Sequence, residues 1–378
     1  MSNTLTNLIP DLFAALDVVS REQVGLVPAV TLDAQAARAA VNQTVRSAIA
    51  PASTASDITP GVTPPNDGDQ SIDNASITIT KARRVPVRWN GEEQLGVNAG
   101  PGYLSIRGQQ FAQAMRTLCN EIEADLAALY KTSSRAYGTA GTAPFGTAGD
   151  YSDAAFVRQI LVDNGAPLSD LQLVLNTTAG ATFRGKQSQV QMTGDQALQR
   201  QGILLDIHGI QIRESAQIKN HTKGTGASYQ SNNVSGYAIG AKTIALDTGS
   251  GTVLAGDVVT FNGNTDKHVI ATALSGGSMA IGAPGLRAAL ADNVAMTVGN
   301  SYAANMAFAR SAIILATRAP ALPEEGDSAS DRMTITDPRS GLTFEVAMYK
   351  QYRQVQYEIS IAWGVANVKP EHTAILLG

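Results

Sequence analysis

Cysteine is almost absent from this sequence of 378 residues, in which Cys119 stands alone. One cysteine excludes a disulfide bond within the chain and does not favour a thiol-ligated metal site. Because Cys119 falls within a helical pattern, we expect it to be a small buried apolar residue.

Charged and aromatic residues are also scarce, at 16% and 5% of the chain, whereas glycine is abundant. This composition predicts a globular protein with many close backbone contacts, in two or three units of ordinary domain size. The net charge of −4 does not favour a protein that binds nucleic acid through a strongly basic surface.

Long apolar runs are missing as well. No segment reaches the roughly 18 apolar residues that a membrane span needs. The first residues lack the basic flank and the apolar core of a secretion signal. We therefore expect a cytoplasmic product with no membrane partner.

Motifs of catalysis are absent too. The four histidines lie on separate segments without metal-ligand spacing, and the chain has no His-Glu-x-x-His, Gly-x-Ser-x-Gly or Gly-Lys-Ser/Thr sequence. We expect each histidine in a turn or at the surface. The sequence thus predicts no catalytic residues and no cofactor-binding residues.

One segment comes close to a metal motif, because Asp67, Asp69, Ser71 and Asp73 alternate along it. An EF-hand loop would need Gly at position 72 and Glu at position 78, where this chain has Ile and Thr. We expect a solvated acidic turn and no metal ligands, with a weak cation site in this loop as the alternative.

Alternating apolar residues dominate the C-terminal part of the chain. One run is formed by Val355, Tyr357, Ile359, Ile361 and Trp363, and an earlier run by Leu342, Phe344, Val346 and Met348. Period-two alternation indicates a strand with one buried face. Residues 351–354 lie between the runs, so we predict a hairpin that reverses there.

A second alternating segment lies between residues 77 and 89 and predicts an extended ribbon, or flap. Pro86 cannot donate a ladder hydrogen bond and predicts an edge strand. Because a two-stranded ribbon is marginally stable at best, we expect it to rest on a neighbouring subunit; the alternative is a ribbon folded back on its own subunit. The predicted interface residues are Arg83, Arg84, Val85, Val87, Arg88, Trp89, Glu92 and Glu93.

Two other patterns organise the rest of the chain. Apolar residues at steps of three and four between Phe111 and Leu129 predict a long amphipathic helix, and residues 5–19 predict a second, N-terminal one. Short β-prone pieces separated by Gly, Asn and Asp at residues 225–300 predict a compact barrel or sandwich.

The closing segment, YEISIAWGVANVKPEHTAILLG, carries an aromatic residue, Gly364-Val365, Lys369-Pro370-Glu371 and a final Leu-Gly. It resembles the end of tailed-bacteriophage major coat proteins related to the coat protein of phage P22. The resemblance implies an α+β fold of the HK97 type with an inserted small β-barrel or sandwich domain. The implied units are a helical N-terminal arm (1–50), an extended flap (51–104), a spine helix (105–137), an axial α/β domain (138–224), the inserted domain (225–300), and the remainder of the axial and peripheral domains with the C-terminal hairpin (301–378).

By this resemblance the chain is a major capsid protein that assembles into an icosahedral phage head around double-stranded DNA, and is not an enzyme. The implied partners are further copies of the chain in hexamers and pentamers, a scaffolding protein, a portal, and packaged DNA through non-specific contact. The protein would be assembled in the host cytoplasm and reside in the virion, with its arm not cut away. The alternatives are a β-rich tail or surface-adhesion protein and a hydrolase with a divergent site.

Overall fold

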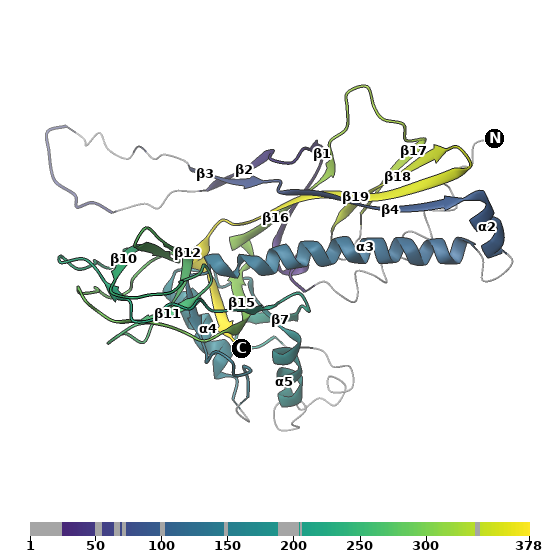
Figure 1. Ribbon diagram of the computed structural model, residues 1–378. Coiled ribbons are helices and arrows are strands. Elements are labelled where there is room, and N and C mark those ends of the chain that lie inside the picture. Colours follow the sequence, from purple (N-terminus) through teal and green to yellow (C-terminus); the bar gives the residue numbers. More distant parts are fainter. Residues whose placement is uncertain are drawn as a thin grey trace.

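The computed structural model describes residues 25–49, 55–63, 69, 73–98, 103–146, 150–187, 204, 206–336 and 341–378. It is an elongated α+β structure made mostly of sheet, with one long helix along its upper part and a compact lower body (Figure 1). The helix expected at residues 5–19 lies outside the described residues.

Six of the described strands form the sheet of the elongated part, in the order β1-β16-β19-β18-β17, with β4 paired to the other edge of β19. Their bounds are β1 (Thr31–Ala39), β4 (Lys81–Asn90), β16 (Ile313–Pro320), β17 (Asp331–Thr336), β18 (Thr343–Gln351) and β19 (Gln354–Asn367). Strands β18 and β19 form an antiparallel hairpin that turns at Tyr352 and Arg353, where the sequence predicts the reversal.

The helical arm expected for residues 1–50 is wrong for residues 31–49. Strand β1 pairs in parallel with β16, and β2 (Thr44–Ile49) pairs with β3 (Asp73–Thr78). The segment is rich in alanine, which favours helix, but pairing with the free edge of β16 packs Leu32 and Ala39 against buried clusters, and a solitary helix would lack this packing. Tertiary pairing therefore overrides local propensity.

The long helix α3 (Tyr103–Ala127) packs along one face of this sheet (Figure 1). Its 25 residues span about 37 Å at 1.5 Å per residue. The apolar stripe of α3 contributes Phe111, Met115, Leu118, Cys119, Ile122 and Leu126 to the core, each at most 1% exposed. Asp125 fastens the helix to the sheet, because its carboxylate accepts the Nε1–H of Trp363 at 2.8 Å and pairs with Lys81 at 2.7 Å.

A buried carboxylate on α3 holds the first described residues in place. Glu123 is fully buried and accepts hydrogen bonds from the backbone N–H groups of Leu26 and Val27, at 2.8 Å each, and from the Ser215 hydroxyl at 2.7 Å. Burial raises the pKa of Glu123, which these donors partly oppose. The segment after residue 24 is thereby anchored to both α3 and the lower body.

The lower body is built on a second sheet, in which the described strands run in the order β7-β6-β15-β20-β5-β12-β13-β10-β9, with β8, β11 and β14 attached beside them. Their bounds are β5 (Arg135–Tyr137), β6 (Leu171–Leu175), β7 (Ile210–Glu214), β8 (Asn220–His221), β9 (Gln230–Ser231), β10 (Thr243–Asp247), β11 (Val258–Phe261), β12 (Lys267–Ser275), β13 (Ser278–Ile281), β14 (Met296–Val298), β15 (Tyr302–Ala309) and β20 (Thr373–Leu377). Helix α4 (Ser152–Asp163) packs against β5, β15 and β20, and α5 (Thr177–Gln187) packs against β6 and β7.

Within this sheet, the strands from β9 to β14 enclose a core of their own. Its buried members all fall between Tyr229 and Met296 and include Ile244, Phe261 and Ile281. This part lies beside β15 and α4 in Figure 1. The chain enters it after β8 and leaves it at β15, which returns to the centre of the sheet between β6 and β20.

Candidate functional site

The predicted docking ribbon belongs to the chain's own core. Strand β4 pairs with β19 at ten consecutive positions, and its only described strand neighbour is β19, so Pro86 lies on an edge strand as predicted. Val87 and Trp89 are 9% and 8% exposed and pack with α3 in the main hydrophobic cluster. Trp89 also donates its Nε1–H to Gln110 of α3 at 2.8 Å. The burial of Val87 and Trp89 within their own subunit favours the alternative that the ribbon folds back on it.

The predicted interface charges also have partners within the chain. Arg84 pairs with Glu358 at 2.6 Å, and Arg83 lies 3.6 Å from Glu121. Glu93 accepts a hydrogen bond from the Asn90 backbone while Asn90 accepts one from the Glu93 backbone, a reciprocal cap that begins helix α2 (Gly91–Asn98). Arg88 and Glu92 are exposed. Arg83 and Arg84 stay more than half exposed beside their partners, so these two residues, like Arg88 and Glu92, are still accessible from outside the chain.

The segment that does leave the body is the hairpin of β2 and β3, which projects at the upper left of Figure 1. Among the described strands, each of the two pairs only with the other. Beyond them, Ile58 and Val62 are fully exposed. The structure thus presents two large apolar side chains to solvent on an extension that has no core of its own.

Gly364 lets the base of this hairpin cross the sheet. A Cβ atom at Gly364 would lie 2.1 Å from the backbone oxygen of Thr78. Non-bonded heavy atoms do not approach so closely, so the backbone would have to shift. Next to it, the N–H of Thr80 donates to the oxygen of Trp363 at 3.0 Å. Ile77 and Ile79 are buried here against Ala316 and Ala362. The Gly-Val step of the C-terminal segment therefore fixes where the hairpin leaves the body.

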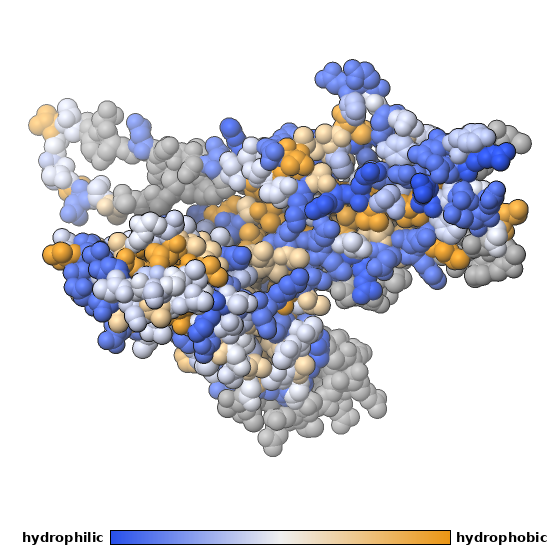
Figure 2. All heavy atoms as spheres, in the orientation of Figure 1, coloured by the Kyte–Doolittle hydropathy of each residue, from blue (hydrophilic) through white to orange (hydrophobic). Residues whose placement is uncertain are grey.

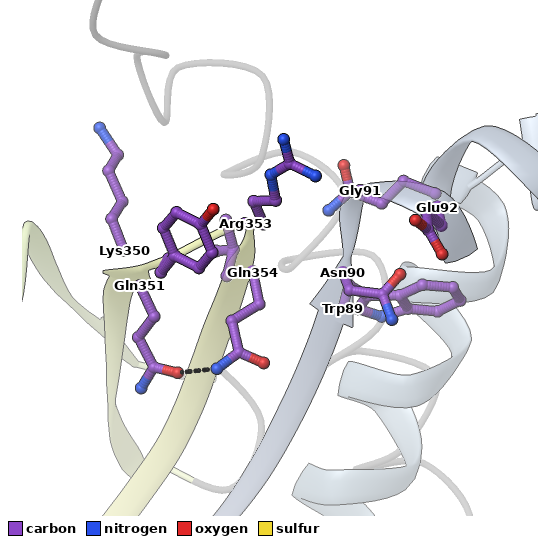
Figure 3. A pocket seen from close by; sticks show the side chains of 11 residues that line it. Trp89, Asn90, Gly91, Glu92, Lys350, Gln351, Arg353 and Gln354 are labelled. Carbon is purple, nitrogen blue, oxygen red and sulfur yellow. Dashed lines mark hydrogen bonds between the residues drawn. The ribbon is translucent and has the colours of Figure 1, made fainter.

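A cavity of about 790 Å³ lies at the other end of the sheet, between α2 and the turn of the β18–β19 hairpin. Figure 3 shows Lys350 and Arg353 extending on the same side from the end of that hairpin, with Glu92 and Trp89 across the gap. The exposed ring of Tyr352, 88% accessible, also lines the cavity. No histidine lines it. The rest of the lining is mostly polar, and its two cations, Lys350 and Arg353, outnumber its one carboxylate, Glu92. Neither cation forms an ion pair with a residue that the structure describes. A cavity with this excess of positive charge suits an acidic protein segment better than a small substrate.

Two of the four histidines are buried, contrary to expectation. His221, 6% exposed, approaches the Asp257 carboxylate at 2.8 Å through Nε2 and the Tyr130 hydroxyl at 2.7 Å through Nδ1. Asp257, in the Gly256-Asp257 step, also accepts the N–H groups of Gly224 and Leu254. No spacing in the sequence points to this array, because Asp257 and Tyr130 lie 36 and 91 residues from His221.

This array joins the end of α3 to the lower body and does not activate a nucleophile. Burial, and then the Asp257 charge, raise the pKa of Tyr130 to about 12, so its hydroxyl stays protonated at neutral pH. An activated phenol would need the opposite change. Tyr302 packs edge-on against Tyr130 and donates to the Gly256 oxygen. The arrangement suits a rigid joint.

His268 is the other buried histidine. It is 0% exposed, and neither ring nitrogen has a hydrogen-bond partner in the part of the chain that the structure describes. Burial lowers its pKa from 6.5 to about 4. Because the unfolded chain binds a proton near pH 6.5 and the folded chain does not, this residue contributes stability that is present above pH 6.5 and is lost as the pH falls towards 4.

We expect protonation of His268 to lower the free energy of unfolding by about 3 kcal/mol between pH 6.5 and pH 4, at 1.36 kcal/mol per pKa unit. Urea unfolding of the full chain at a series of pH values measures it. The variant His268→Leu should lack this component, whereas His208→Asn, which removes an exposed histidine, should keep it. Equal pH profiles for wild type and His268→Leu would contradict the assignment.

Within the described ranges, no group of three or more His, Cys, Asp or Glu side chains is placed to hold a metal ion. The Asp67–Asp73 motif lies largely outside those ranges. None of the described helices is long and apolar enough to cross a membrane.

Comparison with protein-family models gives no match, and no curated protein matches the chain. Solved structures similar to it include the capsid of cyanophage P-SCSP1u, at 13% identity over 94% of this chain and 88% of that one, with a TM-score of 0.47. Two others are a virus-like particle from Pyrococcus furiosus (10% identity, 97% and 98% covered, TM-score 0.46) and the mature capsid of bacteriophage PhiM1 (11%, 92% and 85%, 0.43). Two of the three are phage capsids.

Proposed function

We propose that this chain is the major capsid subunit of a tailed bacteriophage with an HK97-like fold, and that copies of it assemble into a closed icosahedral shell around double-stranded DNA. Its work is geometric. Copies that make head-to-tail contacts form rings when the rotation closes, and such rings can tile a curved surface. From the resemblance of the C-terminal segment to phage coat proteins, we also propose that a scaffolding protein and a portal take part in assembly in the host cytoplasm.

The observation that carries this proposal is the β2–β3 hairpin. It extends from the body with Ile58 and Val62 fully exposed, and an isolated two-stranded hairpin is marginally stable in water. A hairpin of this kind gains stability when a second surface covers it. The elongated sheet of another copy can provide this surface, because every subunit of a homo-oligomer carries both a hairpin and a sheet.

The other features are consistent with this role. The long helix on a twisted sheet gives a stiff wall, and the buried joint at Tyr130, His221 and Asp257 fixes the lower body against that wall. The net charge of −4 suits a subunit that encloses DNA by non-specific contact without gripping it.

Electron microscopy of the purified recombinant chain tests the proposal. We expect closed shells or ring-shaped capsomers. Fibres or trimers would instead favour the tail or adhesion protein, and compact monomers at every concentration would contradict a capsid role. Obligate contacts in such assemblies bury roughly 2,000 Å² or more, so assembly should persist at micromolar concentration.

A further inference from the structure

The six-stranded sheet carries two small exposed surfaces of opposite charge. One is the basic turn, Lys350 and Arg353, at the end of the β18–β19 hairpin. The other is the acidic loop, Glu324 and Glu325, in the connection between β16 and β17. All four side chains are exposed, and none forms an ion pair with another residue that the structure describes.

The acidic loop is held in shape by bonds at its base. The N–H of Gly326 donates to the oxygen of Pro323 at 3.0 Å, which closes a tight turn around the two glutamates. Asp327 pairs with Arg332 and accepts the Tyr349 hydroxyl at 2.8 Å. The loop projects from the sheet at the top of Figure 1, and its surface is hydrophilic in Figure 2. It therefore presents two carboxylates on a preorganised support.

The basic turn is equally fixed. Arg353 has a φ of 56°, in the left-handed region that glycine or asparagine adopts at lower cost. Its backbone oxygen accepts the N–H of Gly91 at 3.2 Å, and its guanidinium lies 5.8 Å from the centre of the Tyr352 ring. This backbone conformation costs energy at an arginine, and such strain is concentrated at functional sites, which indicates a role for the Arg353 side chain.

The two surfaces lie near each other on one copy, since Asp327 and Ser330 bond to Tyr349 and Met348 of β18, just before Lys350. Within that copy they remain unpaired. A contact about a rotation axis that sets the acidic loop of one copy against the basic turn of the next would pair these charges. Such pairing fixes register and disfavours wrong neighbours.

We propose that the cavity between α2 and the β18–β19 turn receives the acidic loop of a second copy, with Glu324 and Glu325 facing Lys350 and Arg353 and the loop covering Tyr352. This contact is separate from the hairpin contact and rests on the proposed capsid function. It assigns a partner to the end of the wall, where the hairpin does not reach.

A charge swap tests it. Shell yield is measured by sedimentation for wild type, Lys350→Glu/Arg353→Glu, Glu324→Lys/Glu325→Lys and the combination of all four. We expect each charge-reversed pair to lower the yield about tenfold or more, because like charges then face each other, and the combined variant to recover most of it. Lys219→Glu/Lys242→Glu, which reverses two exposed lysines elsewhere, is the matched control and should assemble as wild type does.

Each other outcome overturns the inference. If wild type assembles and the charge-reversed pairs do so equally well, or if the combined variant is not rescued, the contact is absent while the capsid function stands. If the reversals instead lower the urea midpoint of the unassembled chain and the combination restores it, the pairing is within one copy. If wild type forms no assembly, the capsid function fails and the inference fails with it.

Discussion

Replacing Ile58 and Val62 by Asp is expected to abolish shell assembly while leaving the folded subunit intact. Both side chains are fully exposed in the isolated chain, so the change removes no core contact. In an assembly, two covered side chains of this size contribute about 3 kcal/mol or more, which is a factor of about 100 in the equilibrium constant of each contact. Sedimentation velocity measures the assembled fraction.

The matched control places the same charges in the same loop. Ser56→Asp/Thr63→Asp adds two carboxylates at exposed positions and keeps both apolar side chains. We expect this variant to assemble far better than Ile58→Asp/Val62→Asp. Equal assembly of both variants at the wild-type level would show that the hairpin tip is not a docking element.

Replacing Trp89 by Ala is expected to lower the free energy of unfolding of the subunit by about 3–5 kcal/mol, the range measured for large aromatic residues in cores. Trp89 packs with α3 and donates a hydrogen bond to Gln110, so its loss leaves a cavity and an unpaired amide. Urea unfolding of the unassembled chain measures this effect.

Arg88→Ala is the control for this change, because Arg88 is the exposed neighbour on the same strand. Its effect on unfolding should stay within about 0.5 kcal/mol. If Trp89→Ala unfolded like wild type and lost only assembly, Trp89 would be an interface residue as the sequence first indicated, and the burial described for β4 would be wrong.

Local patterns in this sequence predict a helix or strand well where the burial of one face of that element determines its type. The alternation on either side of residues 351–354 places the reversal where β18 meets β19. The three- and four-residue steps from Phe111 to Leu129 identify the helix, whose regular part is α3 and ends at Ala127. In both cases the signal is local, since the period of the apolar residues alone fixes the element.

The same patterns do not say which surface covers a buried face. Alternation at Val85, Val87 and Trp89 correctly marks an apolar face, and in the structure this face packs on α3 of the same chain. The strand at residues 31–39 depends on the free edge of β16, nearly 300 residues away, and no local signal encodes it. The burial of His221 depends in the same way on Asp257 and Tyr130.

The docking segment that we propose differs in position from the one that the sequence indicated. The sequence indicated an extended, charged segment that needs a second surface, and it assigned that role to residues 83–93. In the structure the projecting segment is the β2–β3 hairpin, and the sequence signal for its tip is a Pro-, Gly- and Thr-rich stretch with isolated apolar residues.

The central claim is that this hairpin docks on another copy of the chain. A photoactivated cross-linker on Val62→Cys tests it, since Cys119 is buried and the new thiol is the exposed one to label. Light and heavy isotope-labelled chains are mixed, assembled and irradiated, and the cross-linked peptides are identified by mass spectrometry. We predict that about half of the cross-links join light to heavy chains, as random mixing of neighbours requires. Cross-links confined to single chains, in an otherwise assembled sample, would contradict the account.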